Sequence, residues 1–287
     1  MSGADVSGAD DASYCAQLVR EHDFERYAAT LFVAPRARRP LLALYAFNTE
    51  LRRIRDHVSQ PLPGEIRLQW WRDLLEGNAQ GDGSGNPIAA GLLNAVETCR
   101  LPRQTLVDMT EARIFDLYDD PLADSNALEG YAGETASALI QLASLILDAG
   151  EAAKSAEAAG HAGVAQAIAG FLLLMPSHRR RHQLYLPLDI LAATGLDRDT
   201  FLQGEDKPRV SAAIEAFAGL GLEHLAKARK AGSVPAAVFP AFLPVALAEP
   251  VLRRAARAGA DVLDMALQPP QWRRQLRLLR AAVTRRF

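Results

Sequence analysis

The residues with the strongest chemical signal lie in one run, Leu44 to Asp56 (LYAFNTELRRIRD). Arg52 and Asp56 are spaced i, i+4, which places both side chains on one face of a helix. Guanidinium groups suit phosphate oxygens, so Arg52 and Arg53 could bind a diphosphate directly, while their charge repels a divalent cation. We favour the structural alternative, in which these arginines pair with a neighbouring acid, Glu50 or Asp56.

A second run of acids, Asp119, Asp120 and Asp124, matches the spacing of a DDxxxD metal-binding motif. Pro121 stands inside this run and would break a helix there, so the three carboxylates cannot share one helix face. We therefore interpret the segment as a solvated loop and not as a metal site.

His178 and His182 are also spaced i, i+4, but three arginines separate them, and that charge disfavours a bound cation. We interpret this segment as a polar helix end. The chain contains no GxSxG, P-loop or GxGxxG motif, so hydrolase, NTPase and dinucleotide-binding functions lack support, and we expect no nucleic-acid partner. Cys15 and Cys99 have no metal-ligand spacing, which argues against structural zinc or a disulfide framework.

The elements that must position these residues are helices. The 287 residues are 49% hydrophobic and 23% charged, with few β-branched side chains, and the alternation typical of strands is absent. The sequence predicts an all-α protein with a disordered tail at residues 1–10 and a single domain at residues 11–287. Predicted helices start near Asp11 or Ser13, after Pro40 and at residue 65, and cover 23–32, 88–99, 103–118, 126–148, 160–175, 209–230, 236–248, 250–267 and 270–285.

The N-terminus has neither a basic start nor an apolar core, and no apolar run reaches the length of a membrane span. We therefore expect no signal or transit peptide and a bacterial, cytoplasmic protein, with peripheral attachment to the inner membrane as a further option. That option comes from an uneven charge distribution. From Arg253 onward there are nine arginines, no lysine and two aspartates, although the whole chain has a net charge of −2.

The C-terminal segment predicts an amphipathic helix, because five apolar residues recur at spacings of four, three, four and four. These residues are Trp272, Leu276, Leu279, Val283 and Phe287. A basic helix of this kind can lie on an anionic bilayer or on an acidic partner protein. The alternative is a terminal helix that packs its apolar stripe on the core. In the first case the contact residues would be Trp272, Arg273, Arg274, Arg277 and Arg280.

Several segments, in this order, resemble signature segments of the squalene/phytoene synthase family. The order and spacing over residues 13–230 make the resemblance specific, although each segment alone is weak. The segments are Asp23 to Pro35, Leu44 to Asp56, Gln69 to Arg72 (QWWR), Tyr131 to Leu139 (YAGETASAL) and Tyr185 to Pro187 (YLP).

The resemblance implies an isoprenoid-synthase-type helical bundle with a central cavity. Enzymes of this family join two prenyl diphosphates head to head, and two aspartate-rich motifs on facing walls hold Mg²⁺ for that reaction. Carboxylates spaced i, i+4 suit this task, because hard oxygen ligands bind Mg²⁺ and the metal stabilises the diphosphate leaving group.

Aligned on the Tyr-Ala-Phe lead-in, the first motif falls on Arg52, Arg53 and Asp56, and aligned on Tyr-Leu-Pro the second falls on Leu174 and His178. Only one of the expected carboxylates is present, so both motifs are degenerate and we assign no catalytic and no metal-binding residue. The resemblance further suggests cavity-lining roles for Tyr45, Asn48, Trp70, Tyr131 and Tyr185.

Within the family, Asn48 after Phe47 and the run Asp56 to Ser59 resemble the branch that includes a mitochondrial complex I assembly factor. This implies a catalytically degenerate protein that assists assembly of a membrane respiratory complex, with a subunit of that complex as partner and no cofactor. Two alternatives stay open. One is a divergent prenyltransferase that uses Mg²⁺ and Asp56, and the other is a module that binds an isoprenoid or another lipid in the cavity.

Overall fold

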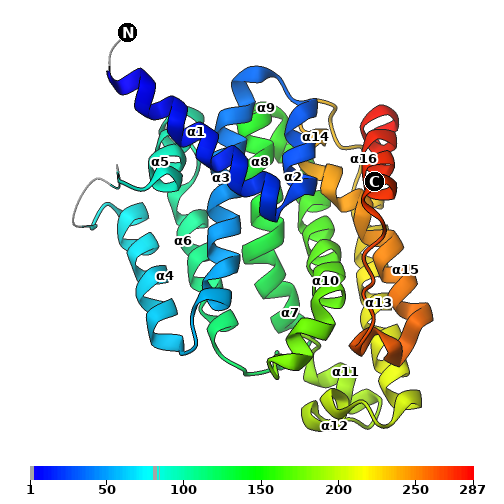
Figure 1. The fold of residues 1–287 in the computed structure, drawn as a ribbon. Coiled ribbons are helices and arrows are strands. Elements are labelled where there is room, and N and C mark those ends of the chain that lie inside the picture. The colour runs from blue at the N-terminus through cyan, green and yellow to red at the C-terminus, as the bar shows by residue number, and fades with distance from the viewer. Residues whose placement is uncertain (1–2, 80–82, 84) are drawn as a thin grey trace.

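The computed structural model describes residues 3–79, 83 and 85–287, and in this part of the chain every regular element is helical (Figure 1). The all-α prediction is thereby confirmed. The longest helix of the bundle, α10 (Ala156–Arg180), packs against α13 (Lys207–Lys230) and α15 (Ala248–Ala258). The other helices are α1 (Gly3–His22), α2 (Phe24–Ala29), α3 (Pro35–Arg53), α4 (Pro61–Glu76), α5 (Pro87–Cys99), α6 (Arg103–Ala112), α7 (Ser125–Ala132), α8 (Ala138–Leu147), α9 (Ala149–Ala152), α11 (Leu188–Ala193), α12 (Arg198–Gln203), α14 (Phe239–Phe242) and α16 (Gln271–Thr284).

Shorter turns join these helices and shape the interior. One of them, η4, is a π-helical turn that interrupts what the sequence predicts as one continuous helix over residues 126–148. The others are 3₁₀ turns. The turns are η1 (Thr30–Phe32), η2 (Ile54–His57), η3 (Phe115–Leu117), η4 (Gly133–Ser137), η5 (Ala153–Ser155), η6 (Leu243–Leu247) and η7 (Gly259–Leu263).

Prolines mark the starts of several helices. Pro35, Pro61 and Pro87 each stand at the first turn of a helix, where a missing N–H costs nothing because that donor has no intrahelical partner. The predicted start of α3 after Pro40 is therefore wrong, since the helix begins at Pro35 and includes Pro40. The predicted end of α10 before Pro176 is also wrong, because the helix continues to Arg180.

The first helix begins at Gly3 and not near Asp11 or Ser13, as helix propagation is easy once a packed segment has nucleated it. Residues 1 and 2 lie outside the described residues. The proposed division into a disordered tail and a domain from residue 11 stays a prediction.

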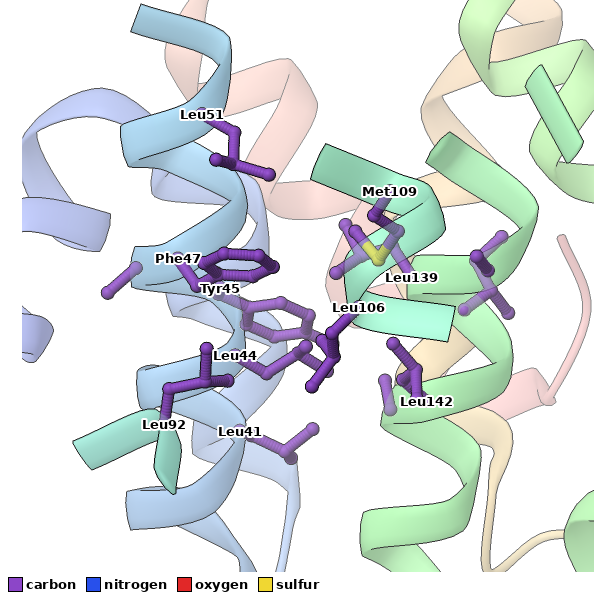
Figure 2. Close-up of a cluster of buried hydrophobic side chains, with 14 of the residues drawn as sticks. Leu41, Leu44, Tyr45, Phe47, Leu51, Leu92, Leu106, Met109, Leu139 and Leu142 are labelled. Atoms are coloured by element: carbon purple, nitrogen blue, oxygen red, sulfur yellow. The ribbon is translucent and has the colours of Figure 1, made fainter. Parts of the chain in front are cut away.

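The core around the N-terminal half of the bundle is built by apolar faces of α3, α5, α6 and α8, which converge in Figure 2. Leu44 and Phe47 of α3 are fully buried there, with Leu92 of α5, Leu106 of α6 and Leu142 of α8. Their burial fixes the angular position of α3. The adjacent face of the same helix then presents Asn48, Thr49 and Arg52 to a cavity.

One helical stretch, Ala149–Arg180, is long and apolar enough to cross a membrane by length and composition alone. Its most apolar window is 56% buried inside the protein, against α13 and α15, as the core helix of a globular bundle would be. The stretch is thus weak evidence for a membrane span.

Candidate functional site: an arginine-lined cavity

A cavity of about 1800 Å³ lies between α2, α3 and η2 on one side and α10, α15 and α16 on the other. Among the described residues that line it are fifteen arginines, no lysine and only five acidic side chains. Apolar residues such as Leu139, Phe171 and Leu173 share its walls. The cavity therefore combines strong positive charge with apolar surface, which suits an amphipathic anion.

Arg52 forms an ion pair with Asp23, which is neither of the two acids expected from the sequence. Its Nη1 lies 3.5 Å from Oδ2 of Asp23, a buried residue that caps α2. Asp23 also binds Arg26 through an Nη1–Oδ2 contact of 2.7 Å, and Arg26 donates to Gln166 of α10 at 3.0 Å. The expected pairing of Arg52 with Glu50 or Asp56 is wrong, because Asp23, at the junction of α1 and α2, bridges two guanidinium groups.

The surroundings of Arg52 destabilise its positive charge. Desolvation in the cavity lowers its pKa, Arg26 and Arg113 lower it further, and Asp23 partly compensates. The side chain nevertheless keeps 41% of its surface accessible, because the cavity is open on one side. Arg52 thus lies at an open, positively charged wall where a bound anion would relieve repulsion between guanidinium groups.

Asp56, the single carboxylate left in the first motif, lines the cavity but is engaged in an ion pair. It forms an ion pair with Arg181, just beyond the end of α10, and both side chains are largely exposed. Arg55 pairs with Asp119 at 3.6 Å, and Asp119 lies in a loop after η3, as the interpretation of the Asp119–Asp124 segment predicts. Arg53 lines the cavity with no ion pair or hydrogen bond among the described residues.

A buried polar network forms the floor of the cavity around Asp116 in η3. The Tyr131 and Tyr185 hydroxyls donate to Oδ1 of Asp116 at 2.7 and 2.8 Å, and Arg113 contacts Oδ2 at 3.1 Å. Gln183 donates to the Asp116 carbonyl at 2.9 Å. All acceptor oxygens of Asp116 are therefore occupied by groups of the protein itself.

Burial and neighbouring charges shift the pKa values of the side chains that form this floor. Desolvation, together with Asp116, raises the pKa of both Tyr131 and Tyr185 well above the ordinary value for tyrosine, so both stay neutral donors. Burial opposes the charge of Arg113, but the Tyr131 and Asp116 oxygens outweigh it and raise its pKa. The floor is thus a fixed arrangement of one carboxylate, one guanidinium and two phenols.

Leu174 and His178, the positions of the second motif, both line the cavity from α10. Leu174 is 45% exposed, whereas His178 is buried against the rings of Phe171 and Tyr185. Desolvation, aided by Arg181, lowers the pKa of His178 to about 4, so the imidazole is neutral near pH 7. Because α10 continues through Pro176, His178 remains on the cavity face of this helix.

Of the five residues suggested as cavity lining, Asn48, Tyr131 and Tyr185 line it and two do not. Tyr45 points from α3 into the hydrophobic core (Figure 2), where it is 2% exposed and lies beneath the guanidinium of Arg26. Trp70 packs edge-on against Trp71, with ring centroids 4.9 Å apart. Both expectations are corrected for the same reason: the apolar faces of α3 and α4 point into the core.

The residues present do not fit a family-type Mg²⁺ site. Among the described residues, no group of three or more His, Cys, Asp and Glu side chains is arranged to hold a metal ion. The three nearest acids are each bound to arginine, namely Asp23 to Arg26, Asp56 to Arg181 and Asp116 to Arg113. The cavity wall therefore offers guanidinium groups where the resemblance implies carboxylates.

The C-terminal helix stands at the rim of the cavity. Trp272, Arg273, Arg274, Arg277 and Arg280 all line it, and Arg274 forms an ion pair with Glu25 of α2. The alternative that the apolar stripe packs on the core is wrong. Instead Leu278 and Ala281 are buried, and four stripe residues face solvent.

The fifth stripe residue, Phe287, leaves the helix. Arg285 turns the chain with a left-handed φ of 52°, and Phe287 then stacks near Phe239 and Phe242. The predicted stripe is thus one residue shorter in the structure.

Sequence reasoning missed Asp23, Arg26, Arg113 and Asp116 as site residues. Asp23 had a local signal, because an aspartate directly before a helical run is a good N-cap. Asp116 had none, since its three side-chain partners come from elements up to 69 residues away.

This chain is similar to known proteins of one family. Residues 19–280 match the squalene/phytoene synthase family model. A rat protein named NADH dehydrogenase (ubiquinone) complex I, assembly factor 6, is 32% identical over 260 residues, which cover 90% of this chain and 78% of the rat protein. A phytoene synthase of Thermus thermophilus is 26% identical over 94% of this chain and 92% of its own length.

A solved squalene synthase from Alicyclobacillus acidocaldarius superposes with a TM-score of 0.72 at 19% identity, over 88% of this chain and 96% of that one. The likeness confirms the expected isoprenoid-synthase-type helical bundle.

Proposed function

This chain belongs to the squalene/phytoene synthase family, and we propose that it assists assembly of a respiratory NADH dehydrogenase complex instead of coupling prenyl diphosphates. The observation that carries the proposal is the exchange on both walls of the cavity. Arg52 and Arg53 stand in the first motif, and Leu174 and His178 stand in the second. No cofactor is part of the proposal.

The physical argument concerns the leaving group. Ionising a prenyl diphosphate needs strong stabilisation of the departing charge, which bridging Mg²⁺ supplies through carboxylate ligands on two sides. Arginines can bind a diphosphate, but they repel the metal. The remaining acids are neutralised by arginine partners, so the proposal does not depend on one altered motif alone.

The relatives supply the second line of support. Mammalian relatives that are named as complex I assembly factors match at 32% identity, while proteins named phytoene synthase match at 23 to 26%. Among the described residues, no group of three or more His, Cys, Asp and Glu side chains could hold a metal ion in place of the lost carboxylates. We propose a subunit of the respiratory complex as partner, and action inside the cell at the inner membrane.

Complementation tests this function. A strain that lacks the gene should contain less assembled NADH dehydrogenase complex and lose NADH:quinone activity in its membranes, and the wild-type gene should restore both. Asp56→Ala should restore both equally well, because the proposal gives Asp56 no chemical role and its ion pair is exposed. Normal complex in the deletion strain would contradict the proposal, and failure of Asp56→Ala alone would favour the prenyltransferase alternative.

A second candidate function, binding of an isoprenoid or another lipid, is favoured by one specific observation. Asn48 lines the cavity, and its side-chain nitrogen is buried with no hydrogen-bond partner among the described residues. An unmade hydrogen bond of this kind costs about 1–3 kcal/mol, which an acceptor oxygen on a bound ligand would remove. Leu139 and Phe171 supply apolar surface for a chain.

Native mass spectrometry of the purified protein tests this candidate. The expected result is a co-purified species with the mass of a lipid, lost in Asn48→Leu but retained in Asn94→Leu, an exposed asparagine of α5. A protein that carries no lipid and takes up none from detergent-solubilised membrane extract would exclude it.

A further inference from the structure

The C-terminal helix α16 carries a continuous apolar surface that none of the described residues covers. Trp272, Leu276, Leu279 and Val283 are 60%, 59%, 50% and 75% exposed. The 3.6-residue repeat places all four on one side of the helix, over more than three turns. Most exposed apolar residues occur singly, so an ordered stripe of four calls for an occupant.

Cations border this stripe on one flank. Arg273, Arg277 and Arg280 lie roughly a quarter to a third of a turn away from it, all exposed. Arg273 stacks over the Trp272 ring at 5.1 Å, while Arg277 and Arg280 have no ion pair among the described residues. No acidic residue follows Asp264 in the sequence, so this flank is uniformly positive.

The same flank forms part of the cavity rim. Arg273, Arg277 and Arg280 belong to both the flank and the cavity lining, as do Trp272 and Leu276 of the stripe. The opposite side of α16 is anchored, because Leu278 and Ala281 pack with Ala28, Ala29 and Leu243. The helix is therefore held with its stripe exposed and with Arg273, Arg277 and Arg280 at the cavity rim.

We propose that α16 docks the protein on the surface of an anionic lipid bilayer, with the stripe between the lipid chains and the arginines at the headgroup phosphates. An amphipathic helix with aliphatic residues and one tryptophan on its apolar side and arginines beside them suits an interfacial position. A second copy of the chain suits it less, because two such helices face to face would bring two rows of unpaired arginines together.

This surface goes beyond the proposed assembly function and holds whether or not that function is confirmed. Docking through α16 brings the mouth of the cavity to the headgroup region, since Trp272 and Leu276 belong to both surfaces. A ligand with an anionic headgroup would then enter the cavity past Arg277 and Arg280 directly from the membrane.

Vesicle binding followed by tryptophan fluorescence tests the proposal on the full-length protein. Trp272 is the one exposed tryptophan of three, because Trp71 is buried and Trp70 is half-buried. Vesicles containing phosphatidylglycerol should sediment the protein and shift its emission to the blue, whereas pure phosphatidylcholine vesicles should do neither. Trp272→Phe should keep the binding and lose the shift.

Variants assign the binding to this face. Leu276→Asp should abolish sedimentation, while Leu62→Asp, at an equally exposed leucine of α4, should leave it unchanged. Arg277→Ser with Arg280→Ser should weaken binding about 20- to 30-fold, as expected for two basic residues near a charged bilayer. Arg36→Ser with Arg39→Ser, a pair on the exposed start of α3, should have no effect.

Three results would overturn the proposal. The first is absence of binding to phosphatidylglycerol vesicles, whether or not a soluble acidic protein binds. The second is binding that Leu276→Asp leaves intact. The third is a dimer in sedimentation equilibrium that Leu276→Asp dissociates, which would make a second copy the occupant. The complementation experiment tests the assembly function separately, and its outcome does not depend on any of these three results.

Discussion

At the scale of single residues, Asp116 shows how side chains of the protein itself stabilise the cavity floor. Its carboxylate accepts from two tyrosine hydroxyls and contacts Arg113, and all of these groups are buried or nearly so. A carboxylate in such surroundings is tolerated only when its charge and its lone pairs are matched. Here the match comes from Arg113, which would itself be an unpaired buried charge without Asp116.

Asp116→Asn should therefore destabilise the protein by about 3–5 kcal/mol, because the change leaves the Arg113 charge uncompensated. Asp119→Asn is the matched control, since the Asp119 side chain is 49% exposed and its pair with Arg55 is worth less than about 1 kcal/mol. Urea denaturation at pH 7 measures both. Equal unfolding free energies for the two variants would show that the network is not a structural element.

His178 makes the stability depend on pH in a defined window. Burial lowers its pKa to about 4, so between that value and about 6.5 the unfolded chain binds a proton that the folded chain does not. The stability that comes from keeping His178 neutral is fully present above about pH 6.5. As pH falls towards 4, this part of the free energy of unfolding is lost, up to ~3 kcal/mol. Denaturation curves at pH 7 and 4.5 should thus differ less in His178→Gln than in wild type.

His182→Asn serves as the control for this pH dependence. His182 lies four residues along the chain, is exposed, and has a left-handed φ of 55°, which asparagine tolerates. This variant should keep the wild-type pH dependence. A His178→Gln protein that loses stability on acidification as steeply as wild type would contradict the assignment.

At the scale of elements, the close approach of α10 to the π-helical turn η4 determines where the cavity lies. Gly163 of α10 has room for no side chain, because an added Cβ would lie far inside contact distance of the Ser137 backbone. The Ser137 hydroxyl also donates to the Gly160 carbonyl at 2.7 Å. This approach holds Tyr131 on one side of the turn and Leu139 on the other, and both side chains line the cavity.

Gly163→Ala should accordingly cost about 3 kcal/mol or more, since neither backbone can give way without moving a whole helix. Gly160→Ala in the same helix meets no atom within 4 Å and should stabilise by up to about 1 kcal/mol through helix propensity. Thermal unfolding of the two variants measures the difference. A Gly163→Ala protein as stable as wild type would mean that the two helices are less tightly packed than described.

Helix type and most helix positions could be predicted from the sequence, because period and propensity are local properties. The exceptions arise from tertiary packing or from the shortness of an element. Pro40 and Pro176 lie inside helices where burial of neighbours such as Met175 and His178 outweighs one lost hydrogen bond. The short helices α11 and α12 were missed, since six residues carry too little periodicity to detect.

At the scale of the whole molecule, the candidate site was predictable only in part. Arg52, Arg53, Leu174 and His178 could be placed on the cavity, because family signature segments flank both motifs. The ion-pair partner of Arg52 could not be predicted, since Asp23 reaches it from the junction of α1 and α2. Helical periodicity revealed the α16 stripe but not whether it faces the core, which depends on how Leu278 and Ala281 pack.

The central claim is that this fold keeps its cavity but does not couple prenyl diphosphates, and a turnover assay tests it most directly. Purified protein is incubated with farnesyl or geranylgeranyl diphosphate and Mg²⁺, and released pyrophosphate and coupled product are measured, with a squalene synthase as positive control. The account predicts no release above the protein-free blank, in wild type and in Asp56→Ala alike. Formation of a coupled product by wild type that Asp56→Ala abolishes would contradict it.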